Sequence, residues 1–373
     1  MSGTVQLTSI GDVIDNFDSM TGVNNWGGQY SQINTGSGRT VDISYDSTVH
    51  AGASGASLKI VYNVPSSADW AGVGIGLANQ PVANISRDIS SYNTFSFDVK
   101  GASAGQSFRI EWKENNVTNT AVVYLSDYLD QTSGSNSGTS TSWQTVNIPI
   151  DAFANFSNNI TNLSEINLIF EHDYLSANGM NTSDTIWIDN IRFSTTAQNA
   201  VRIDSFGDAW GLDALGGNIG TMPDVNTTVS YNSSEFSPAT RCLAFNYYIP
   251  GTAWSGVYFI IGGGIDKNTA VSHDFSAYNN FKIRVKLSSA TNYITKIKFE
   301  ITDAGGTRVA WIPDNSDEGT PLSTSWNEYT VPLTSAGGLQ LNSIKQFNIV
   351  ADYNYRVGAG SGTVYIDSIR FEK

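Results

Sequence analysis

The chain has 373 residues, of which 20 are Lys or Arg and 34 are Asp or Glu, so its formal net charge is −14 at pH 7. This charge argues against nucleic acid and anionic membrane as partners, and it also fits a protein that is merely kept soluble by its surface. The single cysteine, Cys242, allows no disulfide framework and no cysteine-based metal site, and no segment is long and apolar enough to span a membrane.

An internal repeat predicts two domains of the same kind. Residues 185–193 (TIWIDNIRF) return near the C-terminus as residues 363–371 (TVYIDSIRF), and residues 14–17 (IDNF) return as residues 203–206 (IDSF). The offset falls only from 189 residues (203 − 14) to 178 (363 − 185), which is too long for a solenoid and suits two copies of one domain. The two predicted domains span residues 4–196 and 200–373.

Short runs of alternating apolar and polar residues, bounded by Gly, Asn, Asp or Pro, predict β-strands in both copies. In chain order, the predicted core residues are Phe95, Phe97, Val99, Phe108, Ile110, Trp112, Val146, Ile148 and Ile150, then Phe281, Ile283, Val285, Leu287, Ile297, Phe299 and Ile301. No segment shows a helical period over more than two turns. Many short strands with one buried face predict an all-β protein of two tandem β-sandwich domains with a jelly-roll topology.

The terminal strands of each copy place a carboxylate on a face that is otherwise apolar. Alternation puts Asp189 on the same face as Trp187, and Asp367, Asp15 and Asp204 stand in comparable positions. Such a carboxylate is costly unless it is paired or binds a metal. Two carboxylates per domain, on terminal strands that should be neighbours, could hold a hard cation such as calcium. Alternatively, each Asp caps turn amides or pairs with a neighbouring arginine.

Three segments of the first copy carry a family resemblance, namely residues 15–18 (DNFD), 142–149 (SWQTVNIP) and 187–193 (WIDNIRF). Together they resemble carbohydrate-binding modules of the β-jelly-roll type, and families 4, 11, 16 and 22 of that classification are the most similar. The resemblance extends over both copies. It implies a galactose-binding-like β-sandwich fold and polysaccharide binding without catalysis.

The resemblance also implies one structural Ca²⁺ ion per domain, because such modules hold calcium near the paired terminal strands. The candidate ligands in this sequence are Asp15, Asp18, Asp189, Asp204, Asp208 and Asp367. The second copy has Gly207-Asp208 where the first has Asp18, so the two copies differ at that ligand position.

A tryptophan followed by glycines marks a candidate sugar platform. Alternation over residues 70–77 turns Trp70, Gly72 and Gly74 away from the core. The apolar face of a sugar ring stacks on such an aromatic side chain, and the glycines would leave a bare floor for the polymer. The alternative is a tryptophan packed under a loop at the end of its strand. The other candidate contacts of the first copy are Trp26, Gln29, Tyr30, Arg109, Glu111, Glu171 and His172.

The second copy offers a different set, because a side chain fills the floor beside its tryptophan and the specificity should therefore differ. Its candidate contacts are Trp254, Tyr258, Glu300, Asp352 and Tyr353. On another strand of this copy, Lys282, Arg284 and Lys286 all face outward. This basic stripe favours either uronic-acid or sulfated glycans, or it is an ordinary solvated face.

Two other functions compete with binding. Glu111 and Glu171 could form the carboxylate pair of a β-sandwich glycoside hydrolase or polysaccharide lyase. However, the three histidines of the chain share no equivalent position in the two copies, whereas duplicated binding modules gain avidity on a polymer. A cell-surface adhesin or spacer would lack an exposed aromatic face, and Trp70 argues against it.

The sequence therefore predicts a monomeric, non-catalytic protein that binds a polysaccharide, with β-glucan or mannan favoured. We expect it to hold a catalytic domain of the same secreted parent chain near its polymer, with no nucleic-acid or membrane partner. Met1-Ser2-Gly3 is not a signal peptide, so we expect this sequence to come from a longer or processed chain.

Overall fold

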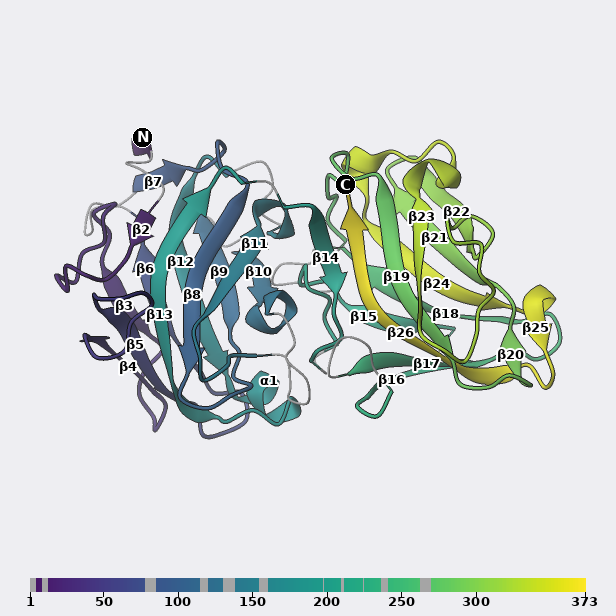
Figure 1. Ribbon diagram of the computed structural model, residues 1–373, viewed down its shortest axis with the longest axis horizontal. Coiled ribbons are helices and arrows are strands. Elements are labelled where there is room, and N and C mark those ends of the chain that lie inside the picture. The colour runs from purple at the N-terminus through teal and green to yellow at the C-terminus, as the bar shows by residue number, and fades with distance from the viewer. Residues whose placement is uncertain are drawn as a thin grey trace. The chain divides into compact units, whose positions relative to one another are not determined.

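The computed structural model describes residues 5–8, 13–77, 85–114, 120–129, 138–153, 160–196, 198–208, 211–223, 225–235, 241–261 and 270–373. The chain divides into two compact units, Met1–Gln198 (unit 1) and Asn199–Lys373 (unit 2). Both consist mainly of strands (Figure 1), so the predicted all-β class with tandem β-sandwiches is confirmed. Among the described residues, no helix has the length and apolar character needed to cross a bilayer.

Unit 1 contains two main sheets. In the first, which we call sheet A1, the order is β10 (Thr120–Tyr124), β9 (Arg109–Glu114), β12 (Leu163–Glu171), β6 (Trp70–Gly76) and β3 (Tyr30–Ile33), with β7 (Ile85–Asp88) and β1 (Val5–Thr8) joined at one end of β12. In the second, sheet B1, the order is β11 (Gln144–Pro149), β8 (Thr94–Gly101), β13 (Ser183–Ser194), β5 (Ser57–Asn63) and β4 (Thr40–Asp46), with β2 (Val13–Asp15) paired to β13. The short helices are η1 (Leu125–Tyr128), η2 (Ile150–Ala152) and α1 (His172–Ala177).

Unit 2 repeats this strand order. Sheet A2 runs β22 (Gly306–Ile312), β21 (Ile297–Asp303), β24 (Gln346–Asp352), β18 (Trp254–Ile260) and β15 (Ile219–Met222). Sheet B2 runs β23 (Asn327–Pro332), β19 (Asn280–Leu287), β26 (Ser361–Glu372), β17 (Cys242–Tyr248) and β16 (Thr227–Asn232), with β14 (Ala200–Asp204) paired to β26. A small extra sheet joins β20 (Tyr293–Ile294) to β25 (Arg356–Val357), and the helices are η3 (Leu333–Ala336), η4 (Leu341–Ser343) and η5 (Tyr353–Tyr355). The internal repeat is thus also a repeat of topology.

The core residues predicted from alternation are all buried, with at most 6% of any of them exposed. Ring stacking gives these cores their specific packing. Trp112 stacks on Phe153 with ring centroids 3.7 Å apart, and Phe281 stacks on Phe299 at 3.8 Å. Burying each such side chain contributes about 1.5–3 kcal/mol, so alternation along the strands supplies most of what holds each sandwich together.

A bulge breaks the alternation in the last strand of each unit, and our prediction of one shared face there was wrong. The pairing of β13 with β8 shifts between Asp189 and Arg192, where Asn190 has a φ of 52°, and Ser368 of β26 has a φ of 51°. The extra residue reverses which side chains face inward. Trp187 is therefore half-buried on the outer side, and its Nε1 donates to Asp46 Oδ2 at 3.0 Å.

Candidate functional site

The outer face of sheet A1 brings several of the predicted contacts together. Trp70 begins β6 with 38% of its surface exposed, and its cross-strand partner on β12 is Glu171. One strand further on, Arg109 of β9 pairs with Ile169 and lies on the same outer face as Glu111. An aromatic ring and a set of charged groups therefore share one side of the sheet.

Arg109 connects the two carboxylates of this face. Its Nη1 lies 2.5 Å from Glu171 Oε1, and its Nη2 lies 2.5 Å from Glu111 Oε1. Tyr124 of β10 donates its hydroxyl to Glu171 Oε2 at 3.3 Å. Burial raises the pKa of Glu171, while the positive charge of Arg109 opposes the rise. Both carboxylates are thus held by one guanidinium group.

A second pair continues the polar row along the same strands. Lys113 Nζ lies 3.0 Å from Glu165 Oε1, and Asn167 lies between them and Glu111. With its amide turned so that both ends are satisfied, Asn167 donates to Glu165 at 2.7 Å and accepts from Lys113 at 2.9 Å. The row offers hydrogen-bonding groups at fixed positions, which is what recognition of sugar hydroxyls needs.

The glycine floor beside Trp70 is covered, which differs from the prediction of a bare floor. Gly72 and Gly74 are buried, and neighbouring strands supply the cover. A Cβ atom on Gly72 would lie 2.5 Å from Ile169 Cδ1, and one on Gly74 would lie 2.6 Å from Ser31 Oγ. The glycines therefore make room for side chains of β12 and β3 rather than for a ligand.

Two residues predicted as sugar contacts, one in a loop and one at the start of β3, make contacts with buried groups instead. Trp26 is only 1% exposed, with its ring 5.7 Å from that of Phe193 and the Arg87 guanidinium 5.6 Å from its centroid. The Tyr30 hydroxyl donates to the buried Asp15 Oδ2 at 2.5 Å. The prediction for Trp26 was wrong because the loop before β3 folds inward, which alternation within strands does not reveal. Tyr30, the first residue of β3, is half-buried, and its contact with a ligand stays a prediction.

Gln29 and His172 remain near the surface. Gln29 is exposed immediately before β3. His172 is half-buried at the start of α1, directly after Glu171, with its Nδ1 3.0 Å from Asp173 Oδ1. Their contact with a ligand stays a prediction.

Sheet A2 carries the same arrangement as sheet A1. Trp254 begins β18 with 42% of its surface exposed, and it pairs with Asp352. Lys298 Nζ lies 2.5 Å from Glu300 Oε1, and Asn348 Nδ2 donates to Glu300 Oε2 at 3.0 Å. By register, Trp254 takes the place of Trp70 and Asp352 that of Glu171. Lys298, Glu300 and Asn348 take the places of Arg109, Glu111 and Asn167, respectively.

Sequence reasoning missed the asparagine in each row and an aromatic residue of unit 2. Asn167 and Asn348 occupy outward positions two residues along the strand from Glu165 and Gln346, so alternation in β12 and β24 could have identified them. Trp311 of β22 is half-buried opposite Lys298, with its ring 4.7 Å from that of Tyr355. The predicted Tyr353 begins η5 nearby in sequence and is half-buried.

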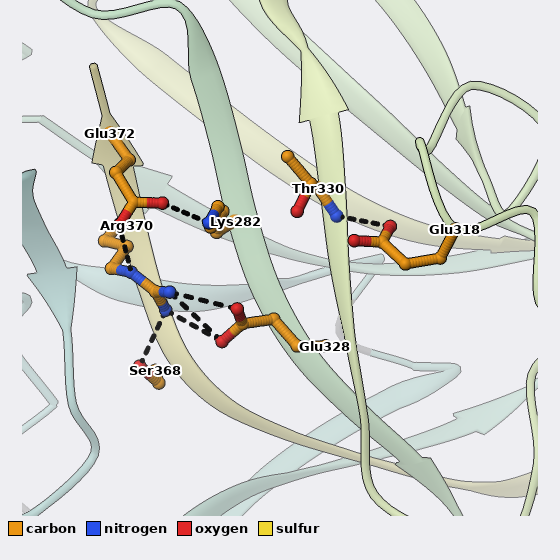
Figure 2. A network of polar contacts seen from close by, with 7 residues as sticks. All are labelled: Lys282, Glu318, Glu328, Thr330, Ser368, Arg370 and Glu372. Atoms are coloured by element: carbon orange, nitrogen blue, oxygen red, sulfur yellow. Dashed lines mark hydrogen bonds and ion pairs between the residues drawn. The ribbon is translucent and has the colours of Figure 1, made fainter.

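Two of the three cations of the outward basic stripe of sheet B2, Lys282 and Lys286, pair with carboxylates, and Figure 2 shows the first of these pairs. Lys282 pairs with Glu372, and Arg370 Nη2 lies 3.1 Å from both carboxylate oxygens of Glu328. Lys286 pairs in the same way with an acidic residue of a loop. This pairing favours the solvated-face interpretation over a site for anionic glycans.

The candidate calcium ligands of unit 1 accept hydrogen bonds from the chain itself. Asp15 Oδ1 accepts from the Phe17 amide at 2.7 Å, and the two oxygens of Asp189 accept from the Ala51 and Asn190 amides at 2.8 and 2.7 Å. Burial raises the pKa of Asp189 to about 6, and the charges of Asp98 and Asp18 add to the rise. These contacts fit the amide-capping alternative, while the crowding of carboxylates is the environment in which a hard cation is favourable.

In unit 2, Asp204 Oδ1 accepts from the Phe206 amide at 2.5 Å, which repeats the contact of Asp15. Asp208 and Asp367 are both buried. In the part of the chain that the structure describes, no three His, Cys, Asp or Glu side chains form a group that could hold a metal. Calcium therefore stays a prediction.

Residues 13–195 match the family model described as carbohydrate binding domain 30, which confirms the predicted resemblance to carbohydrate-binding modules. Among solved structures, the chain is similar to a family 11 carbohydrate-binding module from Clostridium thermocellum in complex with a β-1,3-1,4-mixed-linked tetrasaccharide, at 18% identity and a TM-score of 0.35, over 50% of this chain and 96% of that one. It is also similar to the family 30 module of the Clostridium thermocellum cellulosomal cellulase Cel9D-Cel44B, at 16% identity and a TM-score of 0.32, over 47% and 97% of the two chains.

The N-terminal tandem of two family 22 modules from Paenibacillus barcinonensis Xyn10C is similar over 97% of this chain and 98% of its own, at 13% identity and a TM-score of 0.32. None of the curated proteins matches the chain.

Replacing Trp26 or Trp70 by alanine distinguishes a core residue from a surface residue. We expect Trp26→Ala to lower the free energy of unfolding by about 3–5 kcal/mol, because it empties a buried site. Trp70→Ala should change it by less than about 1 kcal/mol, because its side chain is partly exposed. Urea unfolding followed by circular dichroism measures both. A loss of several kcal/mol in Trp70→Ala would identify that residue as part of the core.

Removing Arg109 should make stability depend on pH. In Arg109→Gln, Glu171 and Glu111 face each other without the guanidinium, so the folded-state pKa of Glu171 rises further. A raised carboxyl pKa costs stability as pH increases above the unfolded value, so we expect a loss of about 1–3 kcal/mol at pH 7 that shrinks toward pH 4. Lys113→Gln, in a more exposed pair, is the matched control and should lose little. An equal loss at both pH values would show that packing of the arginine stem is the cause.

Proposed function

We propose that each unit is a non-catalytic carbohydrate-binding module that holds a polysaccharide chain on the outer face of its A sheet. The observation that carries this proposal is the repetition of one arrangement, an exposed tryptophan beside an ion-paired polar row, at the same register in both units. The family match of residues 13–195 supports the proposal for unit 1. The repeated topology and site extend it to unit 2.

The chemistry of the face suits a neutral sugar polymer. Trp70 and Trp254 can stack on the apolar face of a sugar ring, as aromatic surfaces do with flat apolar partners. The carboxylates, amides and cations of the row can exchange hydrogen bonds with hydroxyl groups. Because opposite charges alternate along the row, its net charge is small, and we favour β-glucan or mannan over an anionic polymer.

The pairing of the carboxylates favours binding over catalysis. A glycoside hydrolase needs one carboxyl group that donates a proton and another that is free to act as base or nucleophile. Here Glu111 and Glu171 share one guanidinium group, and Glu300 is paired with Lys298. The raised pKa of Glu171 is the one feature that a general acid would share, so the experiment below includes a test for products.

Two modules on one chain gain avidity on a polymer, because binding of the first raises the effective concentration of the second. This supports a role in holding an attached catalytic domain near an insoluble substrate. We propose that the parent protein is secreted, acts on the same polysaccharide, and carries these modules as a monomer.

Calorimetric titration with cello- and manno-oligosaccharides tests the proposal. We expect the unmutated protein to bind one of the two series without releasing sugars. Trp70→Ala and Trp254→Ala should each remove one class of sites, and the double variant should bind at least about tenfold more weakly, equivalent to about 1.4 kcal/mol. Trp187→Phe, on the outer side of sheet B1, is the control and should bind normally. New reducing ends or unsaturated products would identify an enzyme instead.

We further propose one structural calcium ion per unit, with Asp15, Asp18 and Asp189 as ligands in unit 1 and Asp204, Asp208 and Asp367 in unit 2. If it is bound, an ion present at a hundred times its dissociation constant stabilises the folded state by about 2.7 kcal/mol. The unfolding temperature should then be higher in Ca²⁺ than in EDTA, and Asp189→Asn should reduce the difference. Identical unfolding temperatures in Ca²⁺ and EDTA would reject the ion and leave amide capping as the role of these aspartates.

A further inference from the structure

One cross-strand pair of the A sheet differs between the two units in which of its strands carries the glycine. In unit 1, Ser31 of β3 pairs with Gly74 of β6. In unit 2, Gly220 of β15 pairs with Tyr258 of β18. The two pairs are equivalent, because β3 and β15 hold the same place in their sheets. Each pair contains one glycine and one residue with a side chain, but the glycine is on β6 in unit 1 and on β15 in unit 2.

In both pairs the side chain lies over its glycine partner. A Cβ atom on Gly220 would lie 2.2 Å from the Oη, 2.3 Å from the Cζ and 2.6 Å from the Cε1 atom of Tyr258. A Cβ atom on Gly74 would lie 2.6 Å from Ser31 Oγ. The glycine at position 220 is therefore required for the tyrosine ring to rest on β15. Asn218 Nδ2 then fixes the ring by donating to its hydroxyl at 3.3 Å.

The position of Tyr258 places it in line with Trp254. The two residues are four apart on β18, whose pairing with β24 has no bulge, so they share the outer face at a separation of about 13 Å. Tyr258 is half-buried, so part of the residue is open to solvent. Between them, a Cβ atom on Gly256 would lie 3.1 Å from Val350 Cγ2 and 3.2 Å from the Met222 methyl carbon, so apolar side chains cover the floor.

The described residues of unit 1 form no such strip. The place of Tyr258 is taken by Gly74, and the nearest side chains above it are Ser31, Ile33 and Asn167, two of which are polar. The apolar part of the face therefore ends one pleat beyond Trp70, where the polar row begins.

We propose that Tyr258 is a second stacking platform, so that unit 2 binds an extended β-linked polysaccharide through two separated sugar rings, whereas unit 1 uses one. This inference rests on the proposed function. The length of polymer that each unit requires then depends on one cross-strand pair, at positions 220 and 258 in unit 2 and at positions 31 and 74 in unit 1. An oligosaccharide must extend over several rings to cover both Trp254 and Tyr258.

The test uses the full chain with one site disabled at a time. In a Trp70→Ala background, which leaves the unit 2 site, we compare cellobiose with cellohexaose and mannobiose with mannohexaose by calorimetry. Replacing the pair by that of unit 1 (Gly220→Ser with Tyr258→Gly) should weaken hexasaccharide binding about tenfold and leave disaccharide binding within about twofold. The reciprocal exchange (Ser31→Gly with Gly74→Tyr) in a Trp254→Ala background should strengthen hexasaccharide binding by unit 1.

Circular dichroism and the unfolding temperature show whether each exchanged pair still folds, and a single Tyr258→Leu variant keeps the β15 contact without the ring. Equal hexasaccharide affinity in the parent, the exchanged pair and Tyr258→Leu, with loss of binding on removing Trp254, would overturn the second platform while upholding the proposed function. Failure of the unmutated protein to bind either series would overturn both.

Discussion

The site of each unit depends on the antiparallel register of three strands. Trp70 of β6 stands opposite Glu171 of β12, and β12 in turn places its outer residues beside Arg109 of β9. The inner residues of β6, such as Val73, are completely buried, so a slip of one residue would carry the apolar set to solvent and Trp70 into the core. The free energy of core packing therefore also fixes the geometry of the outer face, and no separate interaction is needed to align the tryptophan with the polar row.

The ion pairs of the outer face fix the conformations of the polar side chains before a ligand binds. A long arginine or glutamate side chain loses conformational entropy when a ligand orders it. Arg109 is already bound by Glu111 and Glu171, and Lys298 by Glu300, so part of that entropy is lost on folding rather than on binding. The same pairing ties up the carboxylates, which is why an arrangement suited to recognising hydroxyl groups is poorly suited to proton transfer.

Alternation predicted the cores of β8, β9, β19 and β21 because those strands continue their apolar pattern without a break, and burial of one face determines the pattern. It failed in β13, since the left-handed conformation of Asn190 inserts a bulge that no period-2 pattern contains. Trp26, expected at the surface as a residue of a Gly-rich loop, is buried, because the depth of a loop residue depends on how the loop folds back. The candidate contacts on strands lie on the outer face of the A sheet of their own unit, Arg109 and Glu111 in unit 1 and Glu300 in unit 2, whereas Trp26 of the first loop does not.

The surface beside each tryptophan shows that the residue pattern of a single strand does not predict whether that surface is open or covered. Taken by itself, β6 presents a row of glycines and appears open, while β18 presents Tyr258 and appears filled. In the sheet both floors are covered, by Ser31 and Ile169 in unit 1 and by Val350 and Met222 beside Tyr258 in unit 2. Because a Cβ atom at position 74 or 220 would overlap its cross-strand neighbour, the two members of each pair must change together. The difference between the units is therefore a property of paired positions, and it becomes visible only when the register of β3 with β6 and of β15 with β18 is known.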